Sequence, residues 1–131
     1  MALLKADVLS SVHPRLAAIV RLAASRMPFD VQVIQGARTA AQHAANVKKG
    51  VTRTTRSRHV KANNKAGVAC AVDMAPSMGG TIPWQRADLF KTMNTIMQAA
   101  GKELGTPVEW GGNWKTFKDL NHWQLPWKTF P

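Results

Sequence analysis

Apolar side chains recur every three to four positions along two stretches of the chain. These stretches are residues 14–26 and residues 89–104, and their spacing predicts two amphipathic helices. A third helix is predicted over residues 39–49, because Thr39 is a suitable N-cap and Gly50 a suitable stop.

Four shorter stretches have the residue pattern of strands. One alternates apolar and polar residues, and one is a continuous apolar run before Asp73. The other two are short and are each followed by glycine or proline residues that end regular structure. They cover residues 31–35, 68–74, 108–110 and 121–125. Because helices and strands mix without a βαβ repeat, the pattern predicts an α+β fold.

Length and composition limit the class of protein. With 131 residues and 45% hydrophobic residues, the chain is expected to fold as one domain with its own core. The single cysteine, Cys70, excludes an internal disulfide framework. No apolar run approaches the ~20 residues of a membrane span, and the N-terminus lacks the pattern of a signal peptide. We therefore expect synthesis in the cytoplasm.

The chain is strongly basic, with 18 Lys and Arg against 7 Asp and Glu and a net charge of +11. Residues 48–65 contain seven basic residues and no acidic one, and are predicted to form a surface loop. Such a charge attracts polyanions. Two uses remain open, namely adhesion to an acidic cell wall or outer-membrane surface and binding to a nucleic-acid backbone.

Carboxylates are scarce, so the few acidic residues stand out as candidates for chemistry. Asp73 lies inside an apolar run, where a carboxylate is costly unless it is paired or bound to a cation. With His59 and His122 it forms a three-ligand zinc set that leaves a fourth position for water. Asp119 precedes His122 by three residues and is a spare carboxylate for proton transfer. Purely structural interpretations also fit. Asp73 could be a hydrogen-bonded residue at a strand end, His59 a solvated loop residue and His122 a core histidine.

Several short motifs, in their order along the chain, resemble zinc peptidases that cut peptidoglycan stem peptides. These are the D-alanyl-D-alanine carboxypeptidases and the phage L-alanyl-D-glutamate endopeptidases, in the fold group of lysostaphin and hedgehog, and small phage endolysins are the nearest likeness. The motifs are residues 35–39, 57–59, 71–76, 110–114 and 119–124, and residues 12–16 resemble the family's first helix.

The resemblance implies a role for each candidate residue. His59, Asp73 and His122 are implied as ligands of one zinc ion per chain, on a small antiparallel sheet flanked by helices. Asp119 is implied as the general base, and Arg38 as the cation that stabilises the oxyanion. The implied substrate is the peptidoglycan stem peptide, and we expect a monomer. A lysin of this kind waits in the host cytoplasm until a separate protein opens the membrane.

The chain departs from the family pattern between the first two ligands. His59 lies fourteen residues before Asp73, where the family usually has seven, so we expect an insertion within residues 60–67. The family also favours glycine where this chain has Ala69. A loop can absorb such an insertion without moving either ligand.

The preferred function is cleavage of the L-alanyl–D-glutamate bond, with D-alanyl-D-alanine carboxypeptidase activity as the alternative on the same zinc machinery. A third hypothesis is a basic nucleic-acid-binding domain without activity, but the sequence has no zinc-finger, RNP or helix-turn-helix pattern. A zinc site kept only for binding is disfavoured by Asp119 and Arg38. Residues 1–131 are expected to form one peptidase domain without a separate wall-binding module, so the basic residues 48–65 would supply wall affinity.

Some side chains near these motifs receive structural predictions. Trp114 follows a Gly-Gly break and is a candidate for the cleft wall, whereas Trp110 and Trp123 are predicted to pack in the core. His43 is predicted to be solvated on its helix, with a minor role near Arg38.

Overall fold

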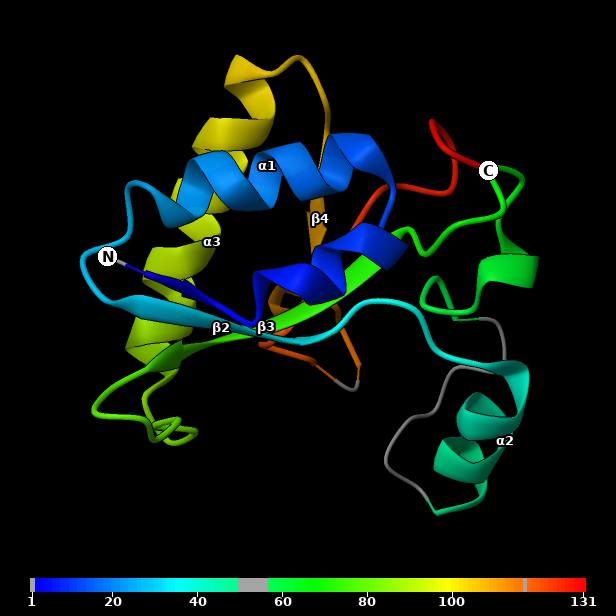
Figure 1. The fold of residues 1–131 in the computed structure, drawn as a ribbon, viewed down its shortest axis with the longest axis horizontal. Helices are drawn as coiled ribbons and strands as arrows, with labels where there is room; N and C mark the ends of the chain where they lie inside the picture. Colours follow the sequence, from blue (N-terminus) through cyan, green and yellow to red (C-terminus); the bar gives the residue numbers. More distant parts are fainter. Residues whose placement is uncertain (1, 50–56, 117) are drawn as a thin grey trace.

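The computed structural model describes residues 2–49, 57–116 and 118–131 (Figure 1). Within them, one sheet has five strands in the order β1-β2-β3-β5-β4. The strands are β1 (Leu3–Leu4), β2 (Asp30–Gln35), β3 (Ala71–Ser77), β4 (Glu109–Trp110) and β5 (His122–Gln124). β1 and β2 pair in parallel, and the other neighbours are antiparallel. The predicted α+β class is confirmed, but the sheet is not wholly antiparallel.

Three α-helices and three short 3₁₀ turns complete the described part of the chain. They are α1 (Pro14–Ala24), α2 (Ala40–Lys48), α3 (Ala87–Glu103), η1 (Ala6–Ser11), η2 (Lys61–Asn63) and η3 (Gly111–Asn113). Helices α1 and α3 pack against each other, and α3 also contacts β3. Helix α2 lies apart from this pair, beyond the end of β2 (Figure 1). No described helix combines the length and the apolar character that a bilayer span requires.

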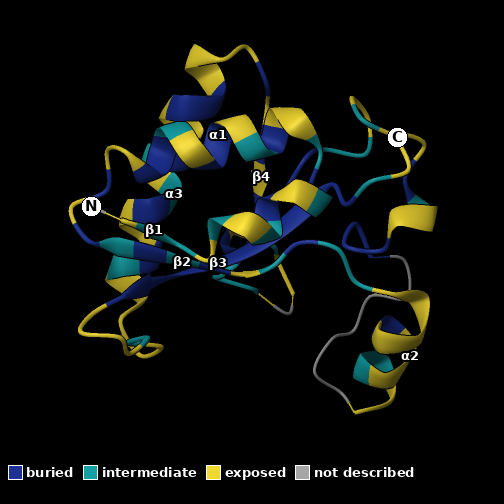
Figure 2. Cartoon of the chain, viewed as in Figure 1, coloured by how far each residue is buried: buried dark blue, intermediate teal, exposed yellow. Residues whose placement is uncertain are grey.

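The core lies between the sheet and the pair α1 and α3. Strand β3 is buried along its whole length, whereas α2 is mostly exposed (Figure 2). Trp123 of β5 is fully buried and stacks on Trp110 of β4, with ring centroids 6.3 Å apart. Their predicted packing role is therefore confirmed. The apolar stripe of α3 supplies Met93 and Met97, which are both fully buried.

The predicted elements are present with shifted boundaries, and the structure adds short elements that were not predicted. The sequence pattern did not predict β1 or η1, because a two-residue strand and a 3₁₀ turn leave no periodicity. The strand predicted at residues 68–74 begins later and extends to Ser77. Its first residues are bonded elsewhere, since Ala69 N–H donates to Ser11 O and Cys70 N–H donates to Arg58 O.

The prediction of a surface loop over residues 48–65 is wrong for part of its second half, although Lys61, Ala62 and Lys65 are exposed. Ser57, Arg58, His59, Val60 and Asn64 are all buried. The Asn64 amide donates to the carbonyls of Arg58, Val60 and Val68, so it holds the segment against the body of the protein.

Arg58 belongs to that buried segment although it was predicted as part of a solvated basic loop. Its guanidinium donates to Phe130 O and lies over the Trp127 ring, 3.9 Å from the ring centroid. Its charge is therefore used to fix the C-terminal segment. Residues 50–56, which include Arg53 and Arg56, lie outside the described residues.

Candidate metal centre

Three segments that are far apart in the sequence bring His59, Asp73 and His122 together. Asp73 on β3 is the direct antiparallel partner of His122 on β5. His59 reaches the same place from the described segment that begins at Ser57. Its carbonyl accepts a hydrogen bond of 2.8 Å from Arg38 N–H. Among the described residues, these three are the group of side chains able to hold a metal ion.

Three ligand atoms form a nearly equilateral triangle. His59 Nε2 and His122 Nδ1 each lie 3.2 Å from Asp73 Oδ1, and they lie 3.3 Å from each other. Nitrogen and oxygen ligands bind a tetrahedral zinc ion at about 2.0–2.2 Å, which sets them roughly 3.3–3.5 Å apart. The spacing of the three atoms therefore fits a small tetrahedral cation.

The outer nitrogens of both rings are bonded to oxygen acceptors. His59 Nδ1 donates to Gly36 O and His122 Nε2 donates to Gln124 Oε1, and both hydrogen bonds are 2.7 Å long. A neutral imidazole has one proton, so these bonds leave the inner nitrogens with lone pairs that face Asp73. Three buried lone-pair donors at this spacing repel one another unless a cation or a proton lies between them. The donor set therefore fits a metal ion.

The charges inside the cluster favour an ionised carboxylate. Burial alone would raise the pKa of Asp73, but the neighbouring His59 and His122 outweigh it and hold the pKa well below its usual range. For His122, burial acts to lower the pKa, while the hydrogen bond and charge of Asp73 raise it above the ordinary value. The carboxylate is thus available as an anionic ligand.

Asp119 lies beside the triangle without belonging to it. Its N–H donates to Gly111 O at 3.0 Å, and its carbonyl accepts from His122 N–H at 3.3 Å. Burial and the negative charge of Asp73 raise the pKa of its carboxyl, while His122 and His59 act in the opposite direction. The charges of all three cluster residues act on this carboxyl, which makes Asp119 the candidate for proton transfer at the site.

A glycine without a side chain makes this arrangement possible. A Cβ on Gly111 would lie 3.0 Å from Asp119 Cβ and 3.2 Å from His122 Cβ, and would collide with the carbonyl oxygen of Asp119. In the sequence, Gly111 stands in the 110–114 motif and interrupts regular structure. The structure shows that it provides space for the two residues.

Arg38 lies at the edge of the cluster and is held from two sides. Its Nε and Nη2 donate to Gln35 Oε1 at 3.1 and 2.7 Å, and its Nη1 donates to His43 Nδ1 at 3.1 Å. Its Nη2 also lies 4.0 Å from Asp73 Oδ2. The prediction that His43 is solvated is wrong, because this side chain is buried against Arg38.

The expected insertion does not separate the ligands. Residues 60–67 turn through η2 and return by way of a hydrogen bond of 2.9 Å from Gly67 N–H to Asn64 O.

Trp114 contacts the cluster, with its ring centroid 5.0 Å from that of His122. The sequence placed Gln35 and Gln124 in the motifs that carry the family resemblance and His43 near Arg38, but the contacts that each of them makes are visible only in the structure.

Comparisons with known proteins give one consistent result. The family model for phage L-alanyl-D-glutamate peptidase matches residues 3–124. The L-alanyl-D-glutamate peptidase of Escherichia phage T5 is 32% identical over 116 residues, which cover 86% of this chain and 80% of that protein. The enzyme of the same name from Listeria phage A118 is 35% identical over 102 residues, but these are 78% of this chain and only 32% of that protein.

A solved structure agrees with the sequence matches. The Serratia marcescens L-Ala D-Glu endopeptidase ChiX superimposes with a TM-score of 0.86 at 31% identity, covering 98% of this chain and 92% of that one. Fold, sequence and family model all point the same way, and the chain belongs to the phage L-alanyl-D-glutamate peptidase family.

Proposed function

We propose that this protein is a zinc peptidase that hydrolyses the L-alanyl–D-glutamate bond of the peptidoglycan stem peptide, as a phage or prophage endolysin. The observation that carries the proposal is the triangle of His59 Nε2, Asp73 Oδ1 and His122 Nδ1, with edges of 3.2–3.3 Å. Family membership supports the choice of bond. It also favours a peptidase over a nucleic-acid-binding domain without activity.

His59, Asp73 and His122 would hold one Zn²⁺ per chain, with two neutral imidazoles and one carboxylate. When bound, the ion supplies Lewis acidity, which polarises a carbonyl and lowers the pKa of water to about 7. Asp119 accepts the proton of the attacking water and delivers it to the departing amine. Its raised pKa favours the first step, because a more basic carboxylate accepts the proton more readily.

Arg38 would stabilise the negative charge that develops on the scissile carbonyl oxygen. Its side chain is only 9% exposed, and Gln35 and His43 fix its orientation. A guanidinium that is already oriented does not need to reorganise during the reaction, which is why fixed donors are effective in catalysis.

The cellular setting and the choice of bond complete the proposal. Residues 1–131 act as one peptidase domain and as a monomer on the cell wall, after a separate protein opens the membrane. The basic residues within 48–65 provide affinity for the anionic wall or outer-membrane surface. The competing D-alanyl-D-alanine carboxypeptidase activity would release a single amino acid from the stem peptide. Mass analysis of digested peptidoglycan distinguishes the two bonds.

The sharpest test of the mechanism is Asp119→Asn, which keeps the shape and removes the proton acceptor. We expect the variant to retain its zinc by elemental analysis and to lose turnover by about 10²- to 10⁴-fold. Asp7→Asn, at an exposed position on η1, is the matched control and should behave as the wild type. Loss of zinc together with activity would place Asp119 among the ligands. Near-normal turnover with zinc retained would contradict its role as the base.

The metal itself is tested by removal and by substitution of a ligand. A chelator should abolish cleavage, and added Zn²⁺ should restore it. His122→Ala should bind zinc weakly because it removes one of three ligands. A metal-free preparation with full lytic activity would refute the zinc mechanism.

A further inference from the structure

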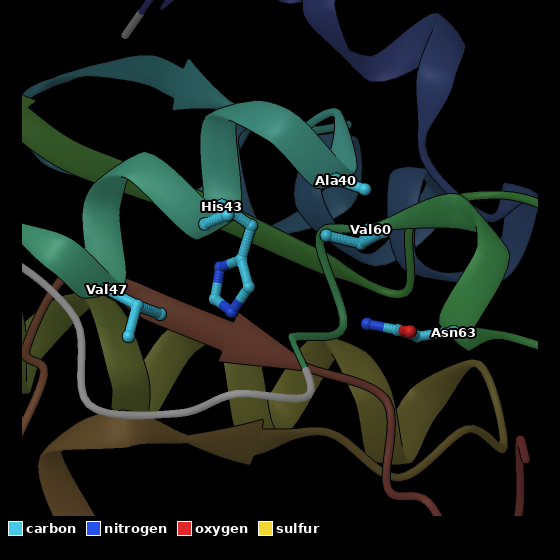
Figure 3. A pocket seen from close by; sticks show the side chains of 6 residues that line it. Ala40, His43, Val47, Val60 and Asn63 are labelled. Carbon is cyan, nitrogen blue, oxygen red and sulfur yellow. The ribbon is translucent and has the colours of Figure 1, made fainter.

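A pocket lies between helix α2 and the segment that follows His59. It has a volume of about 350 Å³ and is lined by Ala40, His43, Ala44, Val47, Val60 and Asn63. Its size is within the range of small-ligand sites. Figure 3 shows the His43 ring projecting from α2 into the space between Val47 and Asn63. None of the roles assigned above uses this pocket.

His43 brings an unused hydrogen-bonding atom to the pocket. His43 is only 5% exposed, and its Nε2 has no hydrogen-bond partner among the described residues. Its Nδ1 faces Arg38 Nη1 at 3.1 Å, and a guanidinium can only donate. In the neutral form of the ring, the proton is therefore on Nε2. A buried N–H without an acceptor is costly, so this position favours a ligand that brings an acceptor.

The charges around the pocket select the kind of acceptor. An adjoining hollow shares Ala40 and Val60 with the pocket and adds the side chains of Arg38 and Lys61. The described lining residues of the two hollows include no carboxylate. Arg38 also polarises the imidazole from its far side, so the Nε2–H donor is strengthened. These features complement an anionic oxygen carried on a short apolar stem.

One side chain connects this pocket to the metal centre. Arg38 bonds His43 through Nη1 and approaches Asp73 Oδ2 through Nη2. The pocket residue His43 and the cluster residue Asp73 are therefore neighbours of the same guanidinium. In an L-alanyl–D-glutamate peptide, the glutamate has two carboxyl groups and the chain continues through only one. The other remains beside the scissile bond, as a free acid or as an amide.

We propose that the α2 pocket is the subsite for this free carboxylate of the D-glutamyl residue, and that His43 Nε2 donates to it. The inference rests on the function proposed above and adds a specificity: the enzyme prefers the free acid over the amide. His43 thereby has two contacts, since Nδ1 holds Arg38 and Nε2 binds substrate.

The test uses two soluble stem peptides that differ only in a free carboxylate or a carboxamide on the D-glutamyl residue. Zinc-loaded wild type should cleave the acid with a kcat/KM about 10- to 100-fold higher, as expected for a hydrogen bond to a charged group. Two substitutions separate the contacts of His43. Asparagine keeps a polar atom near Nδ1, whereas glutamine keeps one near Nε2.

The two variants should fail in different ways. His43→Asn should raise KM for the acid peptide, with kcat little changed, and so reduce the preference towards unity. His43→Gln should keep the preference and lower kcat, because Arg38 loses its acceptor. Ala44→Leu should raise KM by filling the pocket from an exposed helix position. Ala45→Leu, on the same helix but outside the described pocket linings, is the control and should match the wild type.

Each outcome is decisive. Equal kcat/KM on both peptides, or a preference that survives His43→Asn, overturns the subsite while leaving the proposed function intact. If zinc-loaded wild type cleaves neither peptide, both inferences fall. If the His43 variants do not fold, as judged by circular dichroism, Ala44→Leu decides, because an unchanged KM in that variant overturns the subsite.

Discussion

Gln124 lies behind the candidate metal centre and outside its ligand triangle, and its replacement gives a quantitative test. Its Oε1 accepts from His122 Nε2 at 2.7 Å, and both residues are buried. This bond keeps the ring proton on Nε2, so that the Nδ1 lone pair points at the ligand triangle. Gln124→Met keeps the length of the side chain and removes the acceptor.

The expected magnitude follows from these contacts. Loss of the outer hydrogen bond of a ligating histidine typically weakens metal affinity by about 10- to 100-fold, or roughly 1.4–2.7 kcal/mol. The metal-free protein should lose less stability than the loaded one. Without the ion, the ring can move its proton to Nδ1 and donate it to Asp73 Oδ1, which lies 3.2 Å away.

The assay is zinc competition against a chelator of known affinity, together with denaturant unfolding of the loaded and metal-free forms. Gln124→Glu is the matched control. It keeps an oxygen acceptor at the same place and increases the basicity of the ligand, so its zinc affinity should equal or exceed that of the wild type. An unchanged zinc affinity in Gln124→Met would refute the argument that the outer hydrogen bond orients His122.

Two other perturbations test the surroundings of the centre. Gly111→Ala should reduce the free energy of unfolding by about 1–3 kcal/mol and lower zinc occupancy, because its Cβ must displace Asp119 and His122. Asn113→Ala in the same turn is the control, and equal stability of the two variants would contradict this reasoning. Neutralising the basic segment with glutamine should weaken whole-cell lysis and its salt sensitivity, while cleavage of a short soluble stem peptide stays nearly constant; equal losses in both assays would place the segment in the active site. The positions to change are Lys48, Lys49, Arg53 and Arg56.

The sequence by itself determined the local elements and the identity of the chemistry-bearing residues. Helical periodicity located α1 and α3, and Thr39 was the expected N-cap of α2, where the structure adds a capping box with Gln42. A carboxylate within an apolar strand marked Asp73 as paired or bound, because an isolated buried charge is too costly to keep. These signals are local, so one sequence was sufficient to reveal them.

Only the tertiary structure decided how the distant segments support one another. The antiparallel register places Asp73 opposite His122, while Asn64 bonds the carbonyls of a segment that the charge pattern had predicted to be solvated. Gln124, His43 and Gly111 gained their roles in the same way, through contacts with residues close in space. Hydrogen bonds and steric limits of this kind depend on how the chain packs. Side-chain polarity and spacing along the sequence do not encode them in any local pattern.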